Sequence, residues 1–244
     1  MAAGRWWKTS RLERAGPYED NKMIYKENSK LVLPVLVLAL TVPGLAILVG
    51  SQKTQTLTAA ETVGTYSIDP WHTNIGFRVR HMGLAIVLGE FTDYTGTISY
   101  FPNDITKSSV QFTAKVASLD TGVKQRDDHL RSADFFEVEK YPEITFRSTR
   151  LERKSEKTFI AYGDLKIKNV TKQIALPVEF YGVIRDSVGD TRLGGSATLN
   201  INRLDYGIRW SQVLDNGSLV VDNNVQIELQ FEALRQEAKK GAPE

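Results

Sequence analysis

The chain has no cysteine among its 244 residues, and this absence removes several classes of chemistry. Disulfide bonds, thiolate metal sites and cysteine nucleophiles are all excluded. Because a cysteine-free chain can work in any redox compartment, the absence says nothing about location. The sequence also lacks a strong excess of charge, since 31 Lys and Arg residues face 29 Asp and Glu residues, for a formal net charge of +2. Without a basic stripe interleaved with aromatic residues, the sequence does not indicate nucleic-acid binding.

One long hydrophobic run is present, close to the N-terminus. Residues 31–50 contain no charged residue, and a run of about 20 residues has roughly the length that spans a hydrocarbon core. Residues 1–30 before it hold seven Lys or Arg residues against four acids. Positive charge before the run predicts an N-terminus inside the cell and an exported C-terminal part. We therefore interpret 1–30 as a polar basic tail and 31–50 as a transmembrane anchor.

A cleaved signal peptide is the alternative interpretation of residues 31–50. Translation from Met23 instead of Met1 would shorten the charged segment, and the small residues at 58–60 could form a processing site. Both interpretations predict that the remainder of the chain is exported. Residues 51–63 are rich in Thr, Ser, Gln and Ala and have no apolar period, so they predict a linker.

From residue 64 onward, apolar residues recur at every second position. Ile75, Phe77 and Val79, for example, alternate with arginine or glycine. A two-residue period places one apolar row on one face of a β-strand. The same period recurs over 110–116, 144–146, 159–167, 174–180, 193–201 and 225–231.

Short turns separate these runs, and they predict the fold class. Residues 168–171 and 186–190 look like hairpin connections, because Asn and Gly accept positive φ. A helical period occurs only near 123–135. We therefore predict an all-β domain over 64–235, an extended antiparallel barrel of eight to nine strands with one short helical connection, followed by a polar tail at 236–244. A two-sheet sandwich is the alternative architecture.

The interior of such a barrel is either filled by side chains or holds one small ligand. Small residues on the inward rows could leave room for a ligand, or they could merely match the taper of a filled core. The sequence alone leaves both readings open. These small residues are Ala114, Ala161, Gly163, Gly195 and Ala197.

The three histidines, His72, His81 and His129, lie among polar residues near the first strands and the helical connection. A three-histidine metal site is one hypothesis. Against it, no His-x-His or His-x₃₋₄-His pair exists and there is no cysteine ligand, so we predict no metal site. His81 has the same parity as Ile75 and Phe77, which suits an inward, hydrogen-bonded histidine.

The run Arg126-Asp127-Asp128-His129 could serve general acid–base chemistry. Acidic residues at the start of a short helix are more often caps or partners of the helix dipole. No Gly-x-Ser-x-Gly elbow, phosphate loop or dinucleotide fingerprint accompanies the run. We therefore predict no catalytic residues and no enzyme.

Several spaced motifs carry a resemblance to a known family. The sequence resembles the YceI-like proteins, the lipocalin-like polyisoprenoid-binding family, over about residues 64–234. Thr73 stands where the family has Ser, and Asn169 where Gly is usual. The matching motifs are Asp69-x-x-His72-Thr73, Ser118-Leu119-Asp120-Thr121-Gly122, Arg126-Asp127-x-His129-Leu130, Asp134-Phe135-Phe136, Tyr141-Pro142 and Arg203-x-Asp205-Tyr206-Gly207-Ile208.

This resemblance implies an exported barrel that holds a polyisoprenoid lipid or an isoprenoid quinone as a non-covalent ligand, with no covalent cofactor. It favours a cavity over a filled core. The implied role is storage, shielding or transport of the lipid. The alternatives are an enzyme or redox accessory protein that acts on a lipid or quinone at the barrel mouth, and a structural or stress-response interaction module with a filled core. The resemblance implies the periplasm as the compartment, so the predicted location is the inner membrane, crossed once, with the C-terminal domain in the periplasm, or the periplasm itself after cleavage. Residues 31–50 would provide the membrane contact, and a homodimer is left open.

Two groups of candidate site residues follow from the alternation and the motifs. The first should line an apolar channel: Phe77, Val79, Phe112, Val116, Phe146, Leu165, Leu176, Val178, Leu199, Ile227 and Leu229. The second should form or brace a polar mouth: His72, His81, Arg126, Asp127 and His129.

Overall fold

The computed structural model describes residues 57–215, 217 and 219–236. The predicted basic tail, the predicted anchor at 31–50 and most of the C-terminal tail therefore lie outside the described residues. Within the described part, no helix has the length and hydropathy needed to cross a bilayer.

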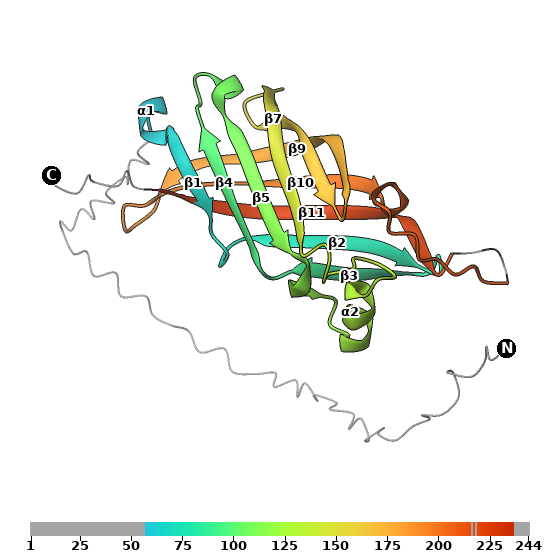
Figure 1. Cartoon of the computed structure of the whole chain (residues 1–244). Coiled ribbons are helices and arrows are strands. Elements are labelled where there is room, and N and C mark those ends of the chain that lie inside the picture. The colour runs from blue at the N-terminus through green and yellow to red at the C-terminus, as the bar shows by residue number, and fades with distance from the viewer. Residues whose placement is uncertain (1–56, 216, 218, 237–244) are drawn as a thin grey trace, which may run out of the picture. The chain divides into compact units, whose positions relative to one another are not determined.

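Eleven strands of the described chain form one antiparallel sheet (Figure 1). They are β1 (Gly64–Ile68), β2 (Asn74–His81), β3 (Ala85–Phe91), β4 (Tyr94–Tyr100), β5 (Ser109–Lys115), β6 (Leu119–Asp120), β7 (Glu143–Arg153), β8 (Thr158–Ile167), β9 (Val170–Arg185), β10 (Thr191–Asn202) and β11 (Val221–Arg235). Two α-helices, α1 (Ala59–Thr62) and α2 (Lys124–Arg131), and three 3-10 turns, η1 (Ile105–Lys107), η2 (Val116–Ser118) and η3 (Arg203–Tyr206), join or precede them.

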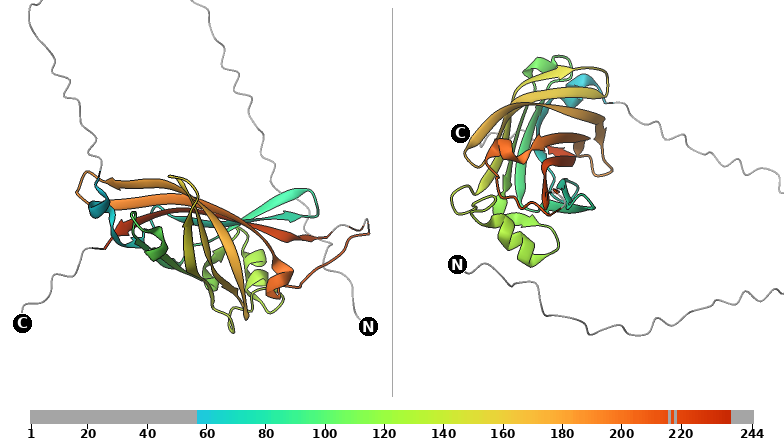
Figure 2. Two further views of the ribbon diagram at one scale, coloured as in Figure 1. Left: turned by 90° about the horizontal axis from the view of Figure 1, so that it is seen from above. Right: turned by 90° about the vertical axis from the view of Figure 1, so that its right-hand side faces the viewer.

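Eight of these strands close into a barrel. The order β1-β4-β5-β7-β8-β9-β10-β11 returns to β1, because the end of β11 pairs with β1 from Ala233 to Arg235. The rest of β11 pairs with β2, which continues the sheet through β3 to β6. Seen from two further sides, the strands wrap around one axis (Figure 2). This arrangement confirms the predicted all-β antiparallel barrel, and the sandwich alternative is wrong.

The two-residue period explains the packing of the strands. In β8 the residues at 159, 161, 163, 165 and 167 are buried, while those between them are partly or fully exposed. The predicted hairpin at 168–171 joins β8 to β9. Its positive φ of 55° falls on Lys168 and not on Asn169. The second predicted hairpin joins β9 to β10 and uses Gly189, with a φ of 97°.

Gly163 and Gly195 do not leave room for a ligand, contrary to one sequence-based reading. Each lies beside a β-bulge, and neither borders a cavity. A Cβ on Gly163 would lie 2.4 Å from the carbonyl oxygen of Arg147, and a Cβ on Gly195 would lie 2.5 Å from that of Glu179. These glycines therefore allow neighbouring strands to approach closely where the sheet bends.

The linker predicted for 51–63 ends in ordered structure. Thr58 and Glu61 form a capping box for α1, in which each side chain bonds the other residue's backbone N–H. The hydroxyl of Tyr66 donates to the carbonyl of Thr62 at 2.6 Å. These contacts fasten α1 to the end of the barrel where β1 begins.

Candidate functional site

An apolar cavity of about 190 Å³ lies inside the barrel. Of the 29 described residues that line it, none has a charged side chain, and the side chain of the one amide residue, Gln111, is exposed. Apolar cavities of about 150 Å³ are known to stay dry and to accept apolar molecules. The wall is therefore suited to hydrocarbon and offers little to a polar ligand.

The cavity is elongated along the strands. On β8 its lining extends from Phe159 to Ile167, and on β9 from Ile174 to Phe180. At about 3.3 Å per residue, the β8 wall alone is roughly 26 Å long. A space of this shape suits a chain better than a compact molecule.

Nine of the eleven predicted channel residues lie on this wall. Val79 instead lines a second pocket. Val116 is only 1% exposed but does not border the cavity, because β5 ends at Lys115 and η2 interrupts the alternation there. The residues placed on the wall are Phe77, Phe112, Phe146, Leu165, Leu176, Val178, Leu199, Ile227 and Leu229.

The second pocket, of about 220 Å³, lies beside α2 and shares Phe77 with the cavity. Ile75 and Phe77 of β2 border the cavity, and Phe77, Val79 and His81 of the same inward row border the pocket. The predicted inward orientation of His81 is consistent with this position. The other lining residues are Arg80, Val87, Arg126, His129, Leu130, Phe135, Trp210, Val220 and Val221.

Two adjacent residues of the predicted mouth hold α2 in place. The Asp127 carboxylate, 6% exposed, accepts hydrogen bonds from the Thr121 backbone N–H at 2.9 Å and from its hydroxyl at 2.5 Å. Arg126 donates from Nε to the Thr121 hydroxyl at 2.7 Å and from Nη2 to its carbonyl at 2.8 Å. Asp127 therefore braces the start of α2, and it does not line the pocket.

His129 belongs to a cluster of aromatic rings in the pocket wall. Its ring packs edge-on against Phe135 and Trp210, with centroids 5.1 and 5.2 Å away. Its Nε2 lies 2.9 Å from an Asp134 carboxylate oxygen. The buried Lys168 donates from Nζ to the carbonyl of Phe135 at 2.8 Å, so the β8–β9 hairpin fixes this wall to the barrel.

Arg203 fixes another part of the pocket wall. This arginine is 3% exposed, and its guanidinium donates to the carbonyls of Ile208, Trp210, Val221 and Asp222. Burial lowers its pKa from the ordinary arginine value. These bonds join η3 and the following loop to the start of β11, which places Trp210 and Val221 beside the pocket.

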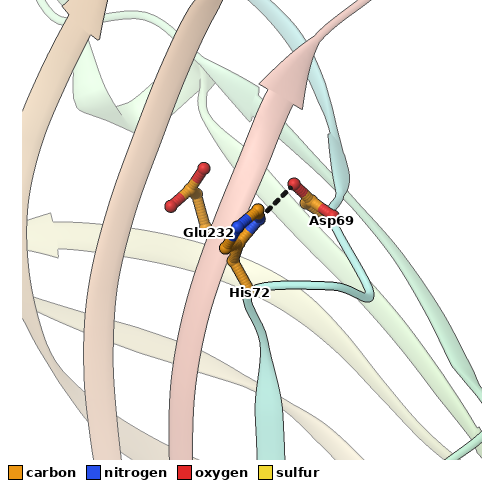
Figure 3. A group of neighbouring side chains, drawn as sticks. All are labelled: Asp69, His72 and Glu232. Atoms are coloured by element: carbon orange, nitrogen blue, oxygen red, sulfur yellow. Dashed lines mark hydrogen bonds and ion pairs between the residues drawn. The ribbon is translucent and has the colours of Figure 1, made fainter. Parts of the chain in front are cut away.

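His72 does not join the other predicted mouth residues. It precedes β2, whereas His81 ends that strand, so roughly 23 Å of strand separates them. A three-histidine metal site is therefore wrong. His72 instead lies near Asp69 and Glu232 (Figure 3). Each of the three residues has one nitrogen or carboxylate oxygen that could bind a metal ion, and these three atoms all lie within 4.8 Å of one another.

Arg192 occupies this cluster as its cation. Its Nη1 lies 2.9 Å from Asp69 and 2.7 Å from Glu232, and its Nε lies 2.7 Å from Asp186. Burial raises the pKa of Asp69, but hydrogen bonds from His72, the Trp71 N–H and Arg192 together bring it below the ordinary value. The bond from Arg192 lowers the pKa of Asp186, and these carboxylates raise that of Arg192. A guanidinium thus neutralises a carboxylate group that could otherwise attract a metal ion.

Sequence analysis did not assign Arg80, Trp210 or Val220–Val221 to the site. Arg80 belongs by parity to the outward face of β2, and Trp210 follows the barrel strands in a loop without a period. The position of His81 at the end of an inward row was the one signal that could have pointed to these neighbours.

Comparison with known proteins agrees with this geometry. The model of the YceI-like domain family matches residues 66–233. The chain belongs to the YceI-like family. A UPF0312 protein of Vibrio cholerae is 35% identical over 182 residues, which cover 74% of this chain and 94% of that protein. A Shewanella baltica UPF0312 protein is 30% identical over 191 residues, covering 78% and 97%.

Solved structures share the fold of this YceI-like chain. A YceI protein of Campylobacter jejuni is 29% identical, with a TM-score of 0.57 over 65% of this chain and 90% of that one. BcnA of Burkholderia cenocepacia gives a TM-score of 0.59 at 22% identity, over 68% and 98%. A polyisoprenoid binding domain from Saccharophagus degradans gives 0.52 at 16% identity, over 70% and 98%.

Proposed function

We propose that the barrel binds a long polyisoprenoid chain non-covalently in its cavity, for storage, shielding or transport. The observation that carries this proposal is the elongated cavity without a charged side chain on its wall. The name of the Saccharophagus degradans neighbour, a polyisoprenoid binding domain, supports the choice of ligand class.

The energetics favour the chain over its head group as the main source of affinity. Burying one methylene contributes about 0.8 kcal/mol, so each isoprene unit of five carbons contributes about 3–4 kcal/mol before the cost of ordering the chain. A polar end group would then mainly set the orientation. We propose that this end lies in the second pocket, which shares Phe77 with the cavity and includes His81 and His129 among its lining residues.

Binding accounts for the structure better than the two alternatives. A module with a filled core would not retain an apolar space of about 190 Å³. For an enzyme, the sequence offers Asp127 and His129 as an acid–base pair. Asp127 is bonded to Thr121, and His129 lies against Asp134 and two aromatic rings. These contacts give both side chains a bracing role, and they do not favour the enzyme alternative.

The test fills the cavity and compares lipid uptake. Ala161 is 2% exposed and lies on the cavity wall, so Ala161→Trp should place an indole in the space of the chain. Ala175 is exposed on the neighbouring strand β9 and supplies the matched control Ala175→Trp. Native mass spectrometry and organic extraction of the full-length protein should recover stoichiometric prenyl lipid from the wild type and from Ala175→Trp, and little from Ala161→Trp.

Thermal unfolding of the three proteins shows whether Ala161→Trp is folded, so that loss of lipid can be assigned to the filled cavity. A wild-type protein that carries no lipid and takes up no long isoprenoid quinone would contradict the proposal. If Ala161→Trp carried as much lipid as the wild type, the cavity would not be the place where the lipid binds.

We also propose that the domain works outside the cytoplasm, in the periplasm or attached to the inner membrane through residues 31–50. The uncharged run and the basic residues before it support this location. Protease added to spheroplasts should cleave the domain while cytosolic markers stay intact. Cell fractionation provides the second measurement. Recovery of all the protein in the cytosolic fraction would contradict it.

A further inference from the structure

The β2–β3 hairpin lies outside the closed ring of strands and has an uncovered apolar face. β3 pairs with β2 along almost its whole length, whereas its other edge pairs with β6 at its last two residues only. Ile86 and Leu88 on β3 are 41% and 59% exposed, and Leu84 in the turn before them is 85% exposed. Soluble monomers seldom expose neighbouring large apolar side chains, so this face is a candidate contact surface.

Cations stand beside these apolar side chains. In the pairing of β2 with β3, Arg78 lies opposite Leu88 and Arg80 lies opposite Ile86, and both arginines are exposed. Residues directly opposite one another in an antiparallel pair share a face of the sheet. The segment from residue 74 to residue 89 contains no Asp or Glu. Segments that lie on membranes bind through buried apolar area together with attraction of their basic residues to anionic lipids.

The charge of this face favours a bilayer over a second copy of the chain. Arg80 forms no ion pair with a described residue, and its one described hydrogen bond is a long one, of 3.5 Å to a backbone carbonyl. Glu228 on the adjoining strand β11 pairs with Arg78 at 3.2 Å, and Glu90 accepts a hydrogen bond from Asn74 at 2.6 Å. The same face of a second copy would bring like charges toward Arg80, whereas anionic lipid head groups bring the opposite charge.

The loop before β11 adds to the apolar surface at this end of the barrel (Figure 1). The Met82 backbone N–H donates to the carbonyl of Val220 at 3.0 Å, which fastens the hairpin turn to that loop. Val213 in the loop is 63% exposed. Arg209 is exposed there too, and so is Asp215, the one acid of the loop. The loop therefore extends the apolar surface without making it acidic.

The other face of the hairpin borders the second pocket. Val79 and Val87 lie opposite one another in the strand pairing, and both line that pocket. The pocket shares Phe77 with the apolar cavity. One hairpin thus has the pocket on one side and its uncovered apolar face on the other. Because a prenyl chain is nearly insoluble in water, a protein that binds one must meet the membrane that holds it.

We propose that the β2–β3 hairpin docks on the surface of a bilayer that contains anionic lipids. Leu84, Ile86 and Leu88 enter the interfacial layer, and Arg80 lies at the lipid phosphates. The contact brings the second pocket to the membrane, where a prenyl chain is exchanged. The docking goes beyond the proposed function, and only the exchange of the chain rests on it.

The test uses the absence of cysteine, which allows a fluorophore to be attached at one introduced site. Full-length Leu84→Cys, labelled with the polarity-sensitive dye NBD, is reconstituted in vesicles of phosphatidylcholine alone or of phosphatidylcholine with phosphatidylglycerol. The label should become brighter and should be quenched by brominated lipids in the anionic vesicles, and added salt should reverse both effects. Arg80→Gln in the labelled protein should lower the ratio of docked to undocked hairpin about fivefold, the contribution of one arginine near an anionic surface.

Two matched controls separate docking by the hairpin from a general effect of the vesicles. Val188 lies in the turn between β9 and β10, at the opposite end of β11 from the β2–β3 turn, and is 80% exposed. Labelled Val188→Cys should give the same emission in both kinds of vesicle. Arg185→Gln, which removes an exposed arginine that pairs with Glu61 at 3.4 Å, should leave the signal of the Leu84 label unchanged. Any residues inserted in the bilayer are the same in all these proteins, so they do not contribute to the differences.

Three results would overturn the docking. The Leu84 label could give equal emission in the two kinds of vesicle, or the Val188 label could respond as strongly as the Leu84 label. A Leu84 label that is already bright without vesicles, and brighter at higher protein concentration, would place a second copy on the hairpin. Prenyl lipid is extracted from the same preparations, so the two proposals can fail separately. Bound prenyl lipid without insertion of the label contradicts the docking alone, and insertion without bound prenyl lipid contradicts the proposed function and the exchange.

Discussion

At the scale of single residues, the cluster around Arg192 makes stability depend on pH. Asp69 and Asp186 both have a lowered pKa in the folded protein. A lowered pKa contributes stability above the ordinary aspartate value of 3.8, and this contribution is lost as pH falls through the folded values. The free energy of unfolding, measured by urea titration, should therefore decrease as the pH is lowered below about 4.

Arg192→Gln should reduce the free energy of unfolding at pH 7, because Arg192 pairs with the carboxylates of Asp69, Asp186 and Glu232. The difference from wild type should shrink at acidic pH, because protonated aspartates no longer need the guanidinium. Arg185→Gln, which removes one exposed pair with Glu61 at 3.4 Å, is the control and should have a small effect at every pH. A constant difference between Arg192→Gln and wild type across the titration would argue against this account.

The residues of the site were predictable where strand parity determined them. His81 shares the inward row of Ile75 and Phe77, and the structure places it in the second pocket beside His129. His72 was grouped with them because the family motif and its polar surroundings resemble theirs. Neither signal shows that His72 and His81 lie at opposite ends of β2. Proximity between polar residues depends on tertiary structure, which parity does not encode.

At the scale of the strand, the β7–β8 bulge depends on Gly163. Its missing Cβ leaves room for the backbone of the neighbouring strand, since a Cβ would lie 2.4 Å from the Arg147 oxygen and 2.7 Å from the Ser148 Cα. Backbone atoms cannot move aside as the end of a flexible side chain can. Gly163→Ala should therefore lower the free energy of unfolding by about 1–3 kcal/mol, as measured by chemical denaturation.

Gly76→Ala provides the comparison for this prediction. A Cβ at Gly76 would lie 3.3 Å from the end of the Asn74 side chain and at ordinary contact distances of 3.6 and 3.9 Å from the carbonyl oxygens of Gly89 and Glu228, so the effect on stability should be small. Equal destabilisation by the two substitutions would show that the loss of a glycine, and not the bulge, determines the cost.

The alternation predicted β8 because one face of that strand is buried, and it missed β3 because this condition fails there. β8 alternates along its whole length, because its inward residues face the barrel interior. β3 reads as the continuous apolar run Ala-Ile-Val-Leu, and both Ile86 and Leu88 are exposed, at 41% and 59%. Since β6 pairs with only the last two residues of β3, most of that strand lies at a sheet edge, where alternation is not required.

At the scale of the whole molecule, the sequence predicted a closed antiparallel barrel but not the strand pairing that closes it. The count of alternating strands and the short hairpins favoured a closed antiparallel meander. The pairing of β11 with both β1 and β2 was not predictable, because it joins segments at least 140 residues apart, the separation of the paired residues His81 and Val221, through backbone hydrogen bonds. This pairing matters for function, since it extends β2 beyond the ring and brings its end, with His81, to the second pocket.

The size of the cavity sets a limit on how much of a chain can contribute to affinity. Each added isoprene unit should strengthen binding while cavity wall remains to bury it, at most about 3–4 kcal/mol per unit before ordering costs. Units beyond the wall of roughly 26 Å would stay in the pocket or in solvent and add little. A series of prenyl alcohols of increasing length, measured by competition binding, should therefore reach a plateau in affinity. In Ala161→Trp the plateau should appear at a shorter chain, because Ala161 lies within this wall. Affinity that rises without limit, or a plateau that does not move in Ala161→Trp, would show that the chain binds somewhere other than the barrel interior.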